Sequence, residues 1–141
     1  MEDTKRRLLW HGMLLFLLGL LTGFVEQKFK NPRMGLAAHL EGVMNGTFLV
    51  VMGAIWTEVR LSDRPKAAAY WSALYGTYAN WAVTTLAAIF GTGTMSPITA
   101  AGQSAKPWQE GLVTFGFMSV GLAMVASSVL VLSGLRRAAA R

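Results

Sequence analysis

The sequence predicts an all-α protein: an integral membrane four-helix bundle, one four-span domain over residues 1–141, with both termini in the cytoplasm. Of its 141 residues, 53% are apolar and only 14% are charged. Four runs of 18 to 25 residues carry no charge apart from Glu41, namely 8–25, 34–57, 67–90 and 111–135. About 20 apolar residues suffice to cross the hydrocarbon core of a bilayer. Basic residues flank these runs, and they orient the chain.

The distribution of Lys and Arg predicts which side of the membrane each connection occupies. Nine basic residues lie in the N-terminus, the 58–66 connection and the C-terminus, against four on the other side. The nine are Lys5, Arg6, Arg7, Arg60, Arg64, Lys66, Arg136, Arg137 and Arg141, and the four are Lys28, Lys30, Arg33 and Lys106. An excess of basic residues marks the cytoplasmic side. The net charge of +6 therefore belongs to the span ends, and we expect no nucleic-acid partner.

The first two helices follow from local signals. The run 8–25 comes after Lys5, Arg6 and Arg7, as the apolar region of a signal peptide would. It is long for that role, lacks a small-residue cleavage site and precedes three more spans, so we expect it to be retained. Asn31-Pro32 is typical of an N-cap followed by proline at the first helical position. The second helix is therefore predicted to begin near Pro32.

The remaining connections differ in length. The charged 58–66 segment is short, so the second and third helices should form a tight antiparallel hairpin. The 91–110 segment before the fourth helix is long and contains Gly, Thr, Ser and two prolines. Loops of this length are often functional lids. We expect this one outside the membrane, over the end of the second helix that carries His39.

His39 is the leading candidate for a cofactor ligand. Ionisable groups in a membrane helix cost roughly 2.5–3.5 kcal/mol each, so they are functional candidates. Gly35, Gly42, Gly46 and Gly53 recur at helical spacing on the same face as His39. A histidine that could bind a metal, on a helix face otherwise lined by glycines, predicts a groove in which a flat macrocycle could bind. Ordinary close packing of helices at the glycines, and a hydrogen-bonding histidine, are the alternatives.

Two asparagines mark a second polar position. Thr77, Asn80 and Thr84 share one face of the third helix. In a hairpin that turns at residues 62–63, facing positions have numbers that sum to about 125, which places Asn45 opposite Asn80. Buried carboxamides must find hydrogen-bond partners. These two are expected either to bond to each other or to hold a polar ligand together.

The depths and directions of His39, His11 and Glu41 in the predicted helices limit the kind of site that they can form. His39 lies about 9 Å above Asn45 and points about 120° away from it, so we expect a large flat cofactor or a site shared between subunits. His11 differs from His39 in depth by about 15 Å, so we expect it to be hydrogen-bonded near Trp10 and to leave any iron five-coordinate. Glu41 is a general acid/base or the partner of a neighbouring Arg or Lys, with pairing favoured. The absence of cysteine excludes disulfides and thiolate chemistry.

Aromatic residues fall into two groups. Five near the span ends are expected to form interfacial belts: Trp56, Tyr70, Trp71, Tyr75 and Trp108. Tyr78 and Trp81 are deeper, and either pack in the core or line an aromatic substrate pocket.

The stretches Arg6–Gly19 and Pro32–Gly46, with His39, Asn45 and the later Asn80, resemble the hydroxylaminobenzene mutases of the styrene oxide isomerase-like membrane protein family. The resemblance covers essentially the whole chain. It implies a homotrimer in the bacterial inner (cytoplasmic) membrane, with haem b near subunit interfaces and its ferric iron acting as a Lewis acid. His39 would be the axial metal ligand beside Gly35, Gly42 and Gly46.

The same resemblance implies the substrate side. Asn45 and Asn80 would line it together with Thr84. The epoxide isomerases of the family place a tyrosine at the position of Thr84, and this departure favours the mutase branch.

The resemblance thus implies an isomerase that converts hydroxylaminobenzene, a small aromatic hydroxylamine, into 2-aminophenol by intramolecular hydroxyl transfer. The nearest alternative is a haem-dependent styrene oxide (epoxide) isomerase. An alternative of another class is a small cytochrome b-type electron carrier, which usually needs two axial ligands. A transporter or interaction subunit without a cofactor is the third.

Overall fold

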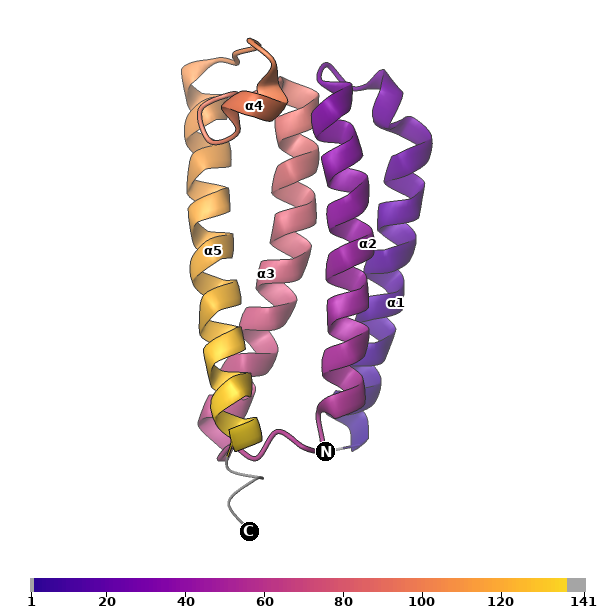
Figure 1. Cartoon of the computed structure of the whole chain (residues 1–141), viewed down its shortest axis with the longest axis vertical. Helices are drawn as coiled ribbons and strands as arrows, with labels where there is room; N and C mark the ends of the chain where they lie inside the picture. The colour runs from indigo at the N-terminus through magenta and orange to yellow at the C-terminus, as the bar shows by residue number, and fades with distance from the viewer. Residues whose placement is uncertain (1, 137–141) are drawn as a thin grey trace.

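The computed structural model describes residues 2–136, and this part of the chain contains helices and no strands. Figure 1 shows the long helices side by side, with a short helix in the connection at one end. In chain order the elements are α1 (Glu2–Val25), the 3-10 turn η1 (Glu26–Lys28), α2 (Pro32–Ile55), α3 (Asp63–Phe90), α4 (Pro97–Ala100) and α5 (Pro107–Arg136). The predicted all-α class is confirmed. Arg137 and Arg141 lie outside the described residues.

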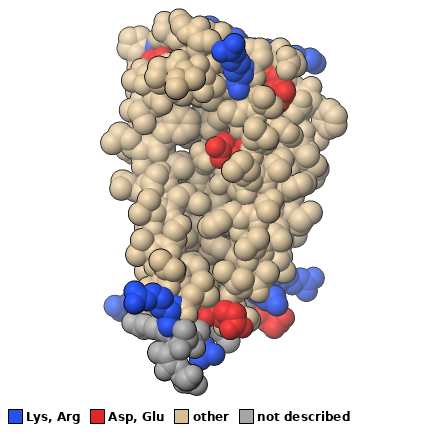
Figure 2. Space-filling model, in the orientation of Figure 1, with Lys and Arg blue, Asp and Glu red and all other residues tan. Residues whose placement is uncertain are grey.

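Three of the helices are long and apolar enough to cross a membrane: α1 with η1, α2 and α5. Although α3 is 28 residues long, it is not among them. Figure 2 shows Lys and Arg only at the two ends of the visible face. Between those ends the surface is largely apolar, and α5 alone exposes Phe115 to 72% and Leu122 to 75%. Apolar surface of this extent marks a membrane or protein interaction.

The helix termini follow the local sequence. Asn31 caps α2, because its Oδ1 accepts a hydrogen bond from the Met34 N–H at 3.2 Å, and Pro32 occupies the first helical position. Gly91 ends α3 in the left-handed conformation, with φ +70°, and its N–H donates to the Ala87 carbonyl. This conformation costs glycine little because it has no Cβ. The predicted start of α2 at Pro32 is confirmed.

The helices form an open row. Backbone contacts join α1 to α2, α2 to α3 and α3 to α5, and at a few positions α1 to α3, whereas the α5 backbone stays more than 8 Å from both α1 and α2. One core cluster fills the end near Trp56 and Tyr70, and a second surrounds Met34 and Val113 near the other end. Within one chain, the predicted four-helix bundle is therefore not closed.

Glycines bring α1 and α2 together at backbone distance. A Cβ added to Gly42 would overlap the Cα of Gly19, and one added to Gly46 would lie 2.5 Å from the Phe16 nitrogen. Gly35 meets the η1 turn instead, at the carbonyl of Glu26. The expectation of an open groove along Gly35, Gly42 and Gly46 is wrong for the single chain, because α1 and η1 fill that face. Small residues allow this close approach.

The connection 91–106 caps the row at the end where α2 begins. It is held by Asn31, whose Nδ2 donates to the Thr99 carbonyl at 3.0 Å, and by Lys30, whose Nζ donates to the carbonyls of Phe90 and Ser104. The predicted position over this end of α2 is confirmed. The short helix α4 was not predicted, although Ser96-Pro97 repeats the pattern seen at Asn31-Pro32.

Glu110 at the start of α5 fixes the same connection from the other side. Its carboxylate accepts hydrogen bonds from the backbone N–H groups of Gly93 (2.9 Å), Thr94 (3.1 Å) and Ala105 (3.1 Å). Backbone donors that converge on one carboxylate are strong, charge-assisted bonds. The connection is therefore tied to both α2 and α5.

Candidate functional site

A carboxyl group joins the two predicted asparagines at the α2–α3 contact. Oε2 of Glu41 accepts a hydrogen bond from Nδ2 of Asn45 at 2.9 Å and another from Nδ2 of Asn80 at 2.5 Å. Glu41 and Asn45 are one turn apart on α2, and Asn80 faces them from α3. The predicted common level of the two asparagines is confirmed. They bond to Glu41, however, and no hydrogen bond joins them directly within the described residues.

Glu41 has amides, and not a cation, as its partners. Across residues 2–136 no Lys, Arg or His forms an ion pair with it, so the favoured pairing with a basic residue is wrong for the single chain. The spacing of four between Glu41 and Asn45 already allowed this contact. Two N–H donors offset part of the cost of burying a polar group. The sequence had nevertheless not identified Glu41 as the bridge.

The carboxamide oxygens of Asn45 and Asn80 are unused hydrogen-bond acceptors in the described part of the structure. Their amide nitrogens donate to Glu41, but no hydrogen bond involves either Oδ1 within residues 2–136. Neither oxygen is among the fully buried, unpartnered polar atoms. The cluster thus presents two hydrogen-bond acceptors on neighbouring helices, suited to a small ligand that carries N–H or O–H groups.

Thr84 lies one turn beyond Asn80 on the same face of α3, but its hydroxyl is already engaged. Its Oγ1 donates to the Asn80 carbonyl at 2.7 Å, and the residue is only 3% exposed. Thr77, on the other side of Asn80, likewise donates to the Ala73 carbonyl at 2.7 Å. The two threonines therefore offer lone pairs but no free proton to a ligand.

His39 faces α1 and has a defined tautomer. Its Nδ1 lies 2.8 Å from the backbone oxygen of Gly19. A carbonyl can only accept, so Nδ1 carries the proton in this bond, and in the neutral ring Nε2 keeps its lone pair. Gly23 provides the space, since a Cβ there would lie 2.8 Å from Nδ1. This arrangement leaves Nε2 suited to bind a metal, with its orientation fixed by the other ring nitrogen.

The surface beside His39 is a shallow, mainly apolar hollow. It has a volume of about 450 Å³ and lies between α1 and α2. Its lining residues are Leu17, Leu20, Leu21, Gly23, Phe24, Glu26, Leu36 and His39. Residues 2–136 contain no cluster of three or more His, Cys, Asp or Glu that could hold a bare metal ion. A haem needs only one such ligand from the protein, so the donor set fits a haem.

One chain does not bring His39 and the asparagine cluster together. His39 bonds to α1, whereas Glu41 and Asn45 bond toward α3. The predicted divergence of His39 and Asn45 around α2 is thus confirmed. Gly42 and Gly46, assigned to the cofactor from their spacing, pack against α1 and line no part of the hollow.

The deeper aromatic residues of α3 tie it to α1. The hydroxyl of Tyr78 lies 3.0 Å from Nδ1 of His11, and Nε1 of Trp81 donates to Oγ1 of Thr22 at 3.0 Å. His11 also packs edge-on against Trp10, with ring centroids 5.0 Å apart. The prediction that His11 is hydrogen-bonded near Trp10 is confirmed. Tyr78 and Trp81 have packing and bonding roles within the chain.

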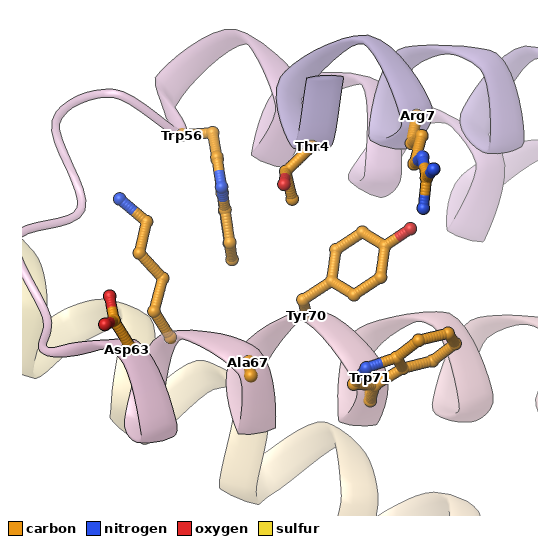
Figure 3. Close-up of a pocket in the computed structure, with 8 residues that line it drawn as sticks. Thr4, Arg7, Trp56, Asp63, Ala67, Tyr70 and Trp71 are labelled. Carbon is orange, nitrogen blue, oxygen red and sulfur yellow. The ribbon is translucent and has the colours of Figure 1, made fainter. Parts of the chain in front are cut away.

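A second hollow, of about 350 Å³, lies at the end where the chain begins. Figure 3 shows Thr4 and Arg7 of α1 on one side and Tyr70 and Trp71 of α3 on the other. Tyr70 is ten residues before Asn80, about 15 Å along the helix, so this hollow is separate from the asparagine cluster.

The exposed fractions of the five aromatic residues confirm the predicted interfacial belt for three of them and correct it for two. Trp71, Tyr75 and Trp108 are more than half exposed, as expected of an interface. Trp56 and Tyr70 are only 2% and 8% exposed, so these two belong to the core.

Known proteins match this chain over nearly its whole length. The model of the styrene oxide isomerase family matches residues 4–136. Hydroxylaminobenzene mutase HabB of Ectopseudomonas oleovorans is 50% identical over 137 residues, which are 96% of this chain and 84% of HabB. Hydroxylaminobenzene mutase HabA of the same organism is 43% identical over 127 residues, covering 89% and 94% of the two chains. No solved structure matches significantly. On these matches, the chain belongs to the styrene oxide isomerase family.

Proposed function

We propose that this protein is an intramolecular transferase that isomerises hydroxylaminobenzene to 2-aminophenol. The observation that carries the proposal is the similarity to two hydroxylaminobenzene mutases, over 96% and 89% of the chain. The acceptor pair of Asn45 and Asn80 supports it, because the substrate carries one N–H and one O–H donor.

The proposed setting is the bacterial inner membrane, crossed four times with both termini in the cytoplasm. α3 would be the fourth span, because its 28 residues are long enough and it packs between α2 and α5. An apolar aromatic substrate would reach the site from the lipid.

His39 is the proposed ligand of a haem b. Its unprotonated Nε2 and the apolar hollow beside it support this role. When bound, a ferric haem supplies a Lewis acid that stabilises negative charge on the hydroxylamino oxygen. Since His39 and the asparagines face different neighbours within one chain, we propose a homotrimer in which haem near the subunit interfaces completes the site.

The side chains of this protein would orient the substrate. In the overall reaction the N–O bond breaks, a C–O bond forms at the ortho carbon, that carbon loses a proton and the nitrogen gains one. Asn45 and Asn80 would accept hydrogen bonds from the N–H and O–H of the substrate, with Thr84 beside them. Holding the fragments together favours return of the hydroxyl to the neighbouring carbon, and apolar surroundings limit capture by water.

The purified protein in detergent tests the activity directly. With hydroxylaminobenzene in water enriched in oxygen-18, 2-aminophenol should form without the label in its hydroxyl. No conversion would contradict the proposed activity, and substantial labelling would contradict transfer within the molecule.

The haem has a test of its own. The purified protein should show a Soret absorbance band that His39→Ala weakens or abolishes, while the control His11→Ala retains it. Active protein that contains no iron, or a His39→Ala variant with an unaltered band, would remove the proposed role of His39.

The name of the matching family favours a second candidate, an epoxide isomerase. Thr84 stands where the epoxide isomerases are expected to have tyrosine, so the mutase ranks first. Turnover of styrene oxide in the same preparation, faster than that of hydroxylaminobenzene, would reverse this order.

A further inference from the structure

We propose that Glu41 is a positioning residue, which holds Asn45 and Asn80 so that their carboxamide oxygens both face the substrate. This inference rests on the proposed hydroxyl transfer and adds to it a residue that acts through the two asparagines. The observation behind it is that one oxygen atom, Oε2 of Glu41, accepts from both amide nitrogens, at 2.9 and 2.5 Å.

A carboxamide by itself does not determine which end faces a ligand. The terminal torsion of Asn is broad and roughly two-fold, so the nitrogen and oxygen can exchange places. In that case Asn45 and Asn80 would present donors as readily as acceptors. They would also be free to bond to each other, which would remove both from a ligand.

Glu41 fixes which end of each carboxamide faces it, because its Oε2 accepts hydrogen bonds from both asparagines. Each asparagine turns its N–H toward that oxygen, so its own oxygen lies on the opposite arm of the carboxamide. Both Oδ1 atoms lack a hydrogen-bond partner within the described residues, and neither atom is fully buried, while the Asn45 residue as a whole is 7% exposed. The result is a pair of acceptors with fixed orientation.

The cost of the arrangement argues for a role beyond joining two helices. Glu41 is the only charged residue within the four apolar runs of the sequence. An acidic residue in a membrane helix costs several kcal/mol, whereas a hydrogen bond between membrane helices averages only about 0.6 kcal/mol. Two asparagines bonded to each other would join α2 and α3 without that cost. Fixing the oxygens of Asn45 and Asn80 is what the carboxyl group adds.

Two variants of similar length separate positioning from simple space filling. Glu41→Gln keeps an oxygen that can accept from both asparagines, whereas Glu41→Met has no comparable acceptor. We expect Glu41→Met to lose about 10- to 100-fold in turnover of hydroxylaminobenzene. Its products should include more 4-aminophenol and more oxygen-18 from labelled water, because the hydroxyl is no longer guided to the ortho carbon. Glu41→Gln should keep a rate and product composition close to those of the wild type.

The composition of the products is the readout that a merely structural role would not change. Ser127→Ala serves as a matched control, since it removes a buried bond between helices, from Oγ of Ser127 to the Ala69 carbonyl at 3.1 Å. That bond joins α5 to α3, about 16 Å along α3 from Asn80. Ser127→Ala should retain the wild-type products and labelling even if it lowers the melting temperature.

Two results would overturn the positioning role. One is a Glu41→Met variant with the rate, products and labelling of the wild type. The other is a Glu41→Gln variant as defective as Glu41→Met, since glutamine retains the acceptor. In either case wild-type formation of 2-aminophenol leaves the proposed function standing. A wild-type protein that makes no 2-aminophenol overturns that function, and the role of Glu41 with it.

Discussion

The two faces of α2 meet their neighbours in opposite ways. Toward α1, glycines bring backbone against backbone, and a Cβ on Gly46 would lie 2.5 Å from the Phe16 nitrogen. Toward α3, Asn45 and Asn80 meet at a shared carboxyl oxygen of Glu41. The α1 contact therefore depends on the absence of side chains, and the α3 contact depends on polar atoms. Added bulk should damage the first contact, and lost polarity should damage the second.

The largest expected effect on stability is at Gly42. A Cβ there would overlap the Cα of Gly19, and backbone cannot move aside as a flexible side chain can. We expect Gly42→Ala to separate α1 from α2 and to destabilise the protein by roughly 3 kcal/mol. Thermal unfolding in detergent measures this loss. A melting temperature equal to that of the wild type would show that the glycine contact is looser than described.

At the α3 contact, Asn80→Ala should affect activity far more than stability. It removes one bond to Glu41 and one acceptor oxygen. We expect about 1 kcal/mol or less of destabilisation and about 100-fold slower turnover of hydroxylaminobenzene. Thr85→Val is the control on the same helix, because among residues 2–136 the Thr85 hydroxyl bonds only to the Trp81 carbonyl of its own helix. If Asn80→Ala turns over at the wild-type rate, the carboxamide is a structural tie.

A smaller, local effect is expected where the connection 91–106 meets α5. Glu110→Gln replaces a carboxylate that accepts from three backbone N–H groups with a neutral amide. We expect faster hydrogen exchange in residues 93–106, because the charge-assisted bonds weaken. Exchange in α1 and α2 should be unchanged, and mass spectrometry measures both. Equal exchange in the variant and the wild type would mean that Glu110 does not hold the connection.

The smallest effect is expected at Gly121 on α5, which sharpens the contrast with Gly42. A Cβ at Gly121 would have no atom within 4 Å. Gly121→Ala should therefore raise stability by up to about 1 kcal/mol, because alanine loses less conformational entropy in a helix. The same thermal unfolding experiment measures it. A clear loss of stability would indicate a neighbour on this face that the single chain lacks.

Helix positions were predictable because apolar runs and caps are local signals. The Asn31-Pro32 pair predicted the first residue of α2. The position of the turn between α2 and α3 predicted that Asn45 lies level with Asn80. The long helices extend beyond the apolar runs, as α1 does to Glu2, because charged residues continue a helix outside an apolar layer. The four apolar runs could not predict whether the helices close into a bundle, because closure depends on which helix faces pack against each other.

The same limit explains the errors at the candidate site. Helical spacing showed that Gly35, Gly42 and Gly46 share a face with His39, but spacing cannot say whether another helix or a cofactor occupies that face. In the structure α1 fills it at Gly42 and Gly46. The sequence did not identify the partners of Glu41, because Asn45 one turn away and Asn80 on the next helix could each reach its carboxyl group, as could a neighbouring basic residue. Only the packing selects between them and a basic residue.

Gly19 makes two contacts with α2, since its Cα adjoins Gly42 and its carbonyl accepts a hydrogen bond from Nδ1 of His39. A slip of α1 by one residue, about 1.5 Å along its axis, would spoil both together. The environment of the His39 imidazole therefore depends on the register between α1 and α2. Nitrogen-15 resonances of the imidazole can consequently serve as a gauge of helix alignment, readable in whole membranes during expression trials or lipid exchange.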